Sequence, residues 1–200
     1  MLDLNAYKEE QRLRFDGMTP QSRVSFCCAA TERLLPLYKA YKEDVDWKAA
    51  EPCLDIGWRF VSSGKKPKIP KRVWDGVGEL ISYYYYEGKP LLLFPLVCAS
   101  GILDAVTDSD SPRCSIDAAR AAMSVHRAAG EVDEALRTAG SPLAGSASVE
   151  ESEWIEAMLA RAASAPLSPA GVDLATRQGL PGWWQALESC ANPVRHVKLA

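Results

Sequence analysis

The longest apolar run of the chain lies within residues 89–106, KPLLLFPLVCASGILDAV. Residues 91–99 are nonpolar at every position, and helical patterns, not the period-2 alternation of a half-buried strand, lie on both sides of them. Ser100, Gly101 and Asp104 end the run well short of the roughly 18 to 20 apolar residues that span a bilayer. The pattern therefore predicts a central helix that is buried on nearly every side, and no membrane span.

Amphipathic spacing predicts further helices on both sides of this segment. Apolar residues recur at steps of three and four over residues 3–15, 20–45, 47–62, 73–86, 115–139 and 148–163, and Pro181 starts a last short helix. Thr19 and Pro20 have the order of an N-cap and a first helical residue, and Gly17 and Gly64 are candidate C-caps. We predict an all-α fold for residues 1–200, a single-domain helical bundle of about seven to eight helices around the buried central helix 89–106.

One segment in the second half of the chain has the composition of a linker. Residues 140–147, GSPLAGSA, are rich in glycine, serine and alanine and form a candidate flexible linker before a C-terminal helical segment, residues 148–191. Ser148 and Glu151 have the spacing of a capping box at the start of that segment. We therefore expect the helix of residues 148–163 to cap itself.

Composition and charge narrow the functional classes. The chain is 48% hydrophobic and 24% charged with a net charge of -3, which argues against a dedicated nucleic-acid binder. Residues 101–200 have 8 Lys and Arg against 13 Asp and Glu, so a charged partner of this half would be basic. The basic segment 65–72 is interpreted as a solvated connector between helices, with a nucleic-acid patch as the alternative. The amino terminus has no secretory pattern, and we expect a cytoplasmic protein.

Aromatic and acidic residues mark the candidate binding surface. Successive helical residues point about 100° apart, so the four rings of the run YYYY at residues 83–86 cannot all be core. The exposed ones suit a protein interface or a ligand pocket, and rings lying flat on neighbouring helices are the alternative. Acidic residues in the loop after the central helix and at the start of helix 148–163 suit a basic partner, with an ordinary solvated surface as the alternative. The candidate partner-binding residues are Tyr83, Tyr85, Tyr86, Asp108, Asp110, Glu150, Glu151 and Glu153.

The sequence offers little catalytic chemistry. It contains no phosphate loop, dinucleotide fingerprint, H-E-x-x-H or G-x-S-x-G motif, and its six cysteines lack C-x-x-C spacing. Cys27 or Cys28 with His126 could in principle form a nucleophile and base, but the cysteines lie on an apolar stripe without a nearby positive charge. We predict no catalytic residue, metal or cofactor, and the chain is not expected to be an enzyme.

A family resemblance adds a functional expectation. Residues 25–41, SFCCAATERLLPLYKAY, combine a small-residue cluster, the ERLLP step and a Leu-Tyr pair, and this text resembles the opening helix of all-helical bacterial immunity proteins. The resemblance continues to about residue 136 and leaves out the last 60 residues. It implies a cytoplasmic protein that neutralises a cognate antibacterial toxin by binding and occlusion. The alternative is a helical small-ligand-binding domain, or an unrecognised hydrolase, with its site near Tyr83 to Tyr86. A homodimer is left open.

Overall fold

The fold is seen in a computed structural model, which describes residues 4–35, 37 and 47–169. Within these residues the chain forms seven α-helices and no strand, so the predicted all-α bundle is confirmed. The α-helices are α1 (Leu4–Asp16), α2 (Pro20–Leu34), α4 (Ala50–Ser63), α5 (Lys71–Tyr86), α6 (Pro90–Thr107), α7 (Arg113–Thr138) and α8 (Ser146–Ser164), and a short 3-10 helix, η1 (Trp47–Ala49), precedes α4. The predicted end of the second helix at residue 45 and the helix starting at Pro181 lie outside the described residues.

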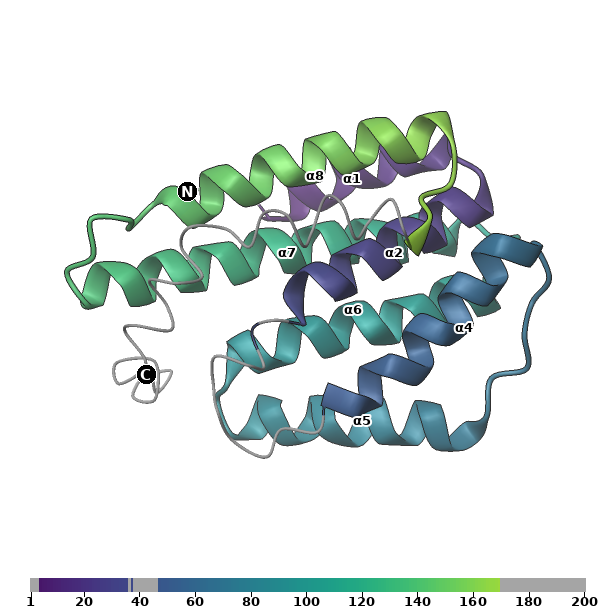
Figure 1. The fold of residues 1–200 in the computed structure, drawn as a ribbon, viewed down its shortest axis with the longest axis horizontal. Coiled ribbons are helices and arrows are strands. Elements are labelled where there is room, and N and C mark those ends of the chain that lie inside the picture. The colour runs from purple at the N-terminus through teal and green to yellow at the C-terminus, as the bar shows by residue number, and fades with distance from the viewer. Residues whose placement is uncertain (1–3, 36, 38–46, 170–200) are drawn as a thin grey trace.

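The predicted central helix is α6, and it is confirmed as the middle of the bundle. It packs against α2, α4, α5 and α7, and Figure 1 shows it between the α1, α7 and α8 side and the α5 edge. Leu92 and Leu96 on one side of the helix are at most 1% exposed, and Phe94, about 200° around the helix from Leu92, is 4% exposed. Burial of one such side chain stabilises the fold by about 1.5 to 3 kcal/mol. Among the described helices, none combines the length and hydropathy of a membrane span.

Small residues allow the helices around α6 to pack closely. The inward side of α7 is largely alanine, with Ala118, Ala122 and Ala129 at most 1% exposed. On α4, a methyl group added to Gly57 would lie 2.4 Å from Sγ of Cys28 and 2.6 Å from a side-chain carbon of Ile102. Gly57 is therefore required where α4 meets α2 and α6.

Among the described residues, five cysteines are buried free thiols and belong to this packing. They are Cys27, Cys28, Cys53, Cys98 and Cys114. Burial raises the pKa of Cys53 and Cys98 to about 12 and that of Cys114 to about 11. It also raises the pKa of Cys27 and Cys28. These side chains are core residues that resist ionisation.

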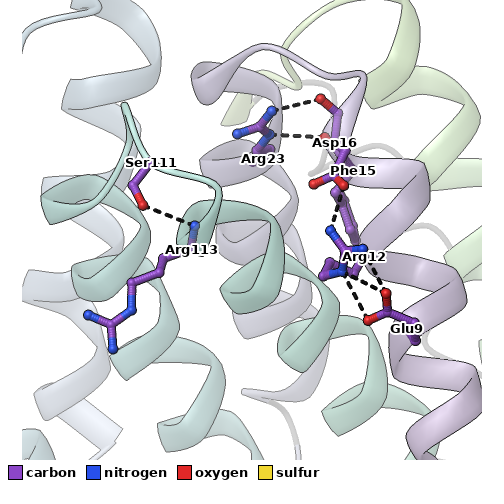
Figure 2. A network of polar contacts seen from close by, with 7 residues as sticks. All are labelled: Glu9, Arg12, Phe15, Asp16, Arg23, Ser111 and Arg113. Atoms are coloured by element: carbon purple, nitrogen blue, oxygen red, sulfur yellow. Dashed lines mark hydrogen bonds and ion pairs between the residues drawn. The ribbon is translucent and has the colours of Figure 1, made fainter.

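The corner between α1 and α2 shows one correct and one wrong cap prediction. Thr19 caps α2 as predicted, because its Oγ1 accepts a hydrogen bond of 3.1 Å from the backbone N–H of Ser22. Gly17 does not adopt the positive φ of a C-cap. Instead the guanidinium of Arg23 donates to the carbonyl oxygens of Phe15 and Asp16 at 2.9 and 3.0 Å, as Figure 2 shows. A side chain from α2 thus satisfies the last carbonyls of α1, and no left-handed residue is needed there.

The start of α8 is held by a residue of α7, and the predicted capping box is wrong. α8 begins at Ser146, so Ser148 lies inside the helix. The carboxylate of Asp133 accepts hydrogen bonds from the backbone N–H groups of Gly145, Ala147 and Ser148 at 2.8, 3.0 and 2.9 Å. One buried acid therefore satisfies three donors that a serine cap could satisfy only in part. The flexibility of residues 140–147 stays a prediction.

Candidate functional site

The tyrosine run lies at the carboxyl end of α5, on the edge of the bundle (Figure 1). Tyr84 is 4% exposed, whereas Tyr83, Tyr85 and Tyr86 are 52%, 70% and 85% exposed. The 100° step between helical residues thus places one ring inward and three outward. The interpretation that the rings lie flat on neighbouring helices does not describe Tyr85 or Tyr86.

The exposed rings lie next to a buried tyrosine of the same run. Tyr84 packs with Leu92 and Leu96 of α6 in a small hydrophobic cluster. Its ring meets that of Tyr83 edge to face with centroids 5.1 Å apart, and Tyr85 and Tyr86 form a second edge-to-face pair at 5.7 Å. Ordered aromatic rings lose little conformational entropy on binding, which is why tyrosine is frequent at protein interfaces.

Acidic side chains surround the rings. Glu79 lies one turn before Tyr83, and Glu87 follows the last helical residue; both are exposed. We call Glu79, Tyr83, Tyr85, Tyr86 and Glu87 the tyrosine surface. Its combination of aromatic rings with two carboxylates suits a basic protein face.

The two predicted loop acids are paired with bases of the same chain. Asp110 forms a 2.9 Å ion pair with Lys66 of the connector between α4 and α5, and Asp108 lies 3.8 Å from Arg113. α6 has 18 residues and is about 27 Å long, and it separates this loop from the tyrosine surface. The structure therefore does not bring Asp108 and Asp110 together with the tyrosines.

The predicted acids of α8 divide into one interior and two outer residues. Glu151 is 1% exposed, and its carboxylate receives hydrogen bonds of 2.7 to 3.1 Å from the Arg33 guanidinium. That guanidinium also lies over the ring of Trp154 at 5.6 Å. Glu153 is exposed, and Glu150 is half-buried with a pKa raised by burial. In Figure 1 α8 and α5 lie on opposite sides of the bundle, so these residues do not join the tyrosine surface.

A pair of carboxylates, Asp104 and Asp117, lies between α6 and α7 and was not predicted from the sequence. Burial raises the pKa of Asp117 to about 6, and the neighbouring Asp104 raises it further, while Arg120, 3.4 Å away, lowers it. The pKa of Asp104 is raised as well, mainly by burial. The two carboxyl groups therefore take up protons at a higher pH than ordinary surface acids. The signal in the sequence that could have predicted this pair is the position of two acids within otherwise apolar helical stripes. The described residues contain no group of three or more ligands that could hold a metal ion.

A groove lies away from the tyrosines, between α4 and the chain after α8. Its volume is about 450 Å³. It is lined by Asp55, Trp58, Arg59, Val61, Ser62, Pro166, Leu167, Ser168 and Pro169. The indole N–H of Trp58 donates to Glu32 at 2.8 Å and fixes that wall. A small ligand would therefore find space here, at a distance from the run of tyrosines where the sequence predicted it.

Comparison with known proteins adds no assignment, because no family model, curated protein or solved structure matches the chain. The resemblance of residues 25–41 to immunity proteins stays a prediction.

Proposed function

We propose that this chain is a non-catalytic immunity protein of the cytoplasm that neutralises a cognate toxin by direct binding and occlusion. The observation that carries the proposal is the tyrosine surface, in which three rings are 52% to 85% exposed on a helix anchored by Tyr84. An exposed aromatic cluster of this kind is an informative departure from an ordinary surface. That the partner is a toxin is inferred from the family resemblance of residues 25–41.

The chemistry of the surface supports a basic protein as the partner. Tyrosine rings supply much of the binding free energy at interfaces when a partner removes them from water. Glu79 and Glu87 would raise the association rate with a positively charged face, and this effect would weaken in salt. A toxin that acts on nucleic acid or phosphate groups presents such a face.

The possible nucleophile and base do not compete with this proposal. The Cys27 thiol is fully buried, and burial raises its pKa, so the reactive thiolate is scarce. His126 stacks on Tyr7 with ring centroids 5.1 Å apart, and burial lowers its pKa. Both residues are explained by packing.

A second candidate function is binding of a small ligand. The groove beside Trp58 favours it, because its volume of about 450 Å³ lies within the range of small-molecule sites. Trp58→Ala would remove such binding and leave the tyrosine surface intact.

The test is co-expression with the toxin encoded by the adjacent gene, followed by growth rescue and pull-down. We expect a stable complex and protection. The triple variant Tyr83→Ser, Tyr85→Ser, Tyr86→Ser should lose both, because each truncated hot-spot ring weakens binding by about 2 kcal/mol. Its matched control is Leu13→Ser with Val149→Ser, since these exposed apolar side chains lie on α1 and α8. If the unaltered chain neither binds the toxin nor protects the cells, the toxin proposal is rejected. If the triple variant binds as well as the unaltered chain, the tyrosine surface is rejected as the binding site.

Charge reversal separates the two acidic locations. Glu79→Lys with Glu87→Lys should lower the association rate at low salt by about tenfold, while Glu150→Lys with Glu153→Lys should leave it nearly unchanged. The opposite result would move the binding site to α8.

A further inference from the structure

The charges at the two ends of α5 oppose the dipole of the helix itself. Its first turn contains Lys71 and Arg72 and no acid, its last turn contains no base, and Glu87 follows it. Cations favour the carboxyl end of a helix and anions the amino end, so these charges oppose the dipole of α5. Lys71 is paired with Asp75 of the same helix at 2.7 Å, which offsets part of the unfavourable charge. Lys68 in the exposed connector adds to the positive end, and the charges that remain still oppose the dipole.

Two glycines of α5 also lack an explanation within the described chain. A methyl group added to Gly76 or Gly78 would meet nothing within 4 Å, in contrast to Gly57. Glycine weakens a helix interior, and here no neighbouring helix uses the space. Gly78 is exposed and lies at the middle of α5.

Gly78 belongs to a seam with the spacing of a paired helix. Residues 71, 75, 78, 82 and 85 follow steps of four and three, which places them along one side of α5. All five residues are exposed, and the middle of the seam is small, with Gly78 and Ser82. The ends are large, with Lys71 at one and Tyr85 at the other. A second helix could approach closely at the middle and make contacts at both ends.

We propose that this seam binds a second copy of the chain, with the two α5 helices antiparallel around a two-fold axis at Gly78. The seam is symmetric in length about Gly78, so Lys71 of one copy faces Tyr85 of the other. On the flank, Arg72 lies about 3 Å along the axis from the level of Tyr86 of the other copy. A cation over a tyrosine ring is a favourable contact, and each occurs twice because the interface is isologous. The Glu79 side chains flank the axis within reach of Arg72 of the second copy.

The antiparallel arrangement also explains the unfavourable charges. It places the carboxyl end of one α5 beside Lys71 and Arg72 of the second copy, and the amino end beside Glu87. Charges that oppose the dipole of their own helix thus complement the dipole of the other helix. This self-complementarity favours a second copy over a uniformly basic or acidic partner.

The expected dimer is weak. α5 has 16 residues and is about 24 Å long, so one helix pair covers less than the roughly 1,200 Å² of a stable interface. We expect exchange between monomer and dimer in the micromolar range. The dimer interface shares Tyr85 and Tyr86 with the proposed toxin-binding surface. Toxin and second copy would therefore compete for these rings, and only this competition rests on the proposed function.

Sedimentation velocity on the full chain at about 10 to 500 µM tests the dimer. The unaltered protein should shift toward the dimer as concentration rises. Gly78→Gln should weaken association by at least about tenfold, because a long side chain at the axis separates the helices. Gly76→Gln is the matched control, since it adds the same side chain to the same helix away from the seam. Both positions have open space within the chain, so both variants should fold.

A monomer at every concentration overturns the inference, as does loss of the dimer in both variants or in neither. Cross-linking supplies the geometry: in a Cys190→Ser background, Gly78→Cys should form a disulfide-linked dimer under mild oxidation and Gly76→Cys should not. Equal cross-linking at the two positions also overturns it. Toxin binding is measured separately at nanomolar concentration, where the chain is monomeric, so failure of the dimer and failure of the proposed function are distinguishable.

Discussion

α8 and α5 lie on opposite sides of the bundle and use their polar and aromatic side chains in opposite ways (Figure 1). On α8, Glu151 is buried against Arg33, Glu156 pairs with Arg14 of α1, and Trp154 is 7% exposed. On α5, three of four tyrosines face outward, and Lys71 pairs with Asp75, one turn away in the same helix.

The difference shows that a cluster of acids or rings does not by itself define a binding surface. Both helices were predicted as binding elements because both concentrate these residue types. On α8, Glu151 points into the bundle because Arg33 of α2 lies close enough to pair with it. Among the described elements α5 packs mainly against α6, and three of its four tyrosines face outward.

The largest expected effect is at the α8 interface with α2. Glu151→Ala should lower the free energy of unfolding by about 3 to 5 kcal/mol, because Arg33 would remain buried and charged without its partner. Urea unfolding followed by circular dichroism measures it. Glu153→Ala, on the exposed side of α8, is the control and should change the value by less than about 0.5 kcal/mol. Equal effects at the two positions would contradict the contrast between inner and outer acids.

A pair of glycine substitutions compares the packed interior with α5 directly. Gly57→Ala should destabilise by about 1 to 3 kcal/mol, because its methyl group would overlap Cys28 and Ile102. Gly78→Ala should stabilise the monomer by up to about 1 kcal/mol, since it improves helix propensity without a clash. Thermal unfolding at low protein concentration measures both. A loss at Gly78 as large as at Gly57 would mean that α5 is more covered than its exposure indicates.

The polar cap of α8 should contribute less than its buried ion pair. Asp133→Ala removes the acceptor of three backbone N–H groups and should lower the free energy of unfolding by about 1 to 2 kcal/mol. Glu134→Ala, next to it and exposed, is the matched control. Hydrogen exchange at residues 146–148 should accelerate in the first variant only, and unchanged protection there would show that Asp133 is not the cap.

The smallest expected effect on stability is on α5. The triple variant Tyr83→Ser, Tyr85→Ser, Tyr86→Ser should change the free energy of unfolding by less than about 0.5 kcal/mol per residue, because these rings contribute little to the core. Tyr84→Ser is the inward counterpart and should destabilise clearly. If the triple variant unfolds as readily as Tyr84→Ser, the outward rings are structural and the comparison with α8 fails.

Local patterns were enough to predict most of the fold. The order Thr19-Pro20, the apolar run of α6 and Gly64 after α4 each depend on a few neighbouring residues, and the structure has helix boundaries at all three. The 3.6-residue period also predicted that the tyrosines could not all be buried. Val77 and Tyr84, seven residues apart, form the buried stripe of α5.

The errors concern interactions between distant parts of the chain. Arg33 is 118 residues from Glu151, and no local pattern links them, so Glu151 looked like a surface acid and a capping-box residue. Asp133 caps α8 from 12 to 15 residues away, and Arg23 replaces the expected glycine cap of α1. In each case a charged side chain from another helix satisfies backbone or carboxylate groups, which depends on tertiary packing.

The five buried thiols of the described residues can be used to measure transient opening of the bundle. The thiolate is the species that alkylating reagents attack, and burial holds the pKa of Cys98 near 12. A reagent can therefore modify these cysteines only in conformations that expose them, in which α2 has moved away from Gly57 of α4 for Cys28 and α6 away from Ala121 of α7 for Cys98. The labelling rate of each cysteine, followed by mass spectrometry without denaturant, measures how often each side of the central helix becomes accessible in the native protein.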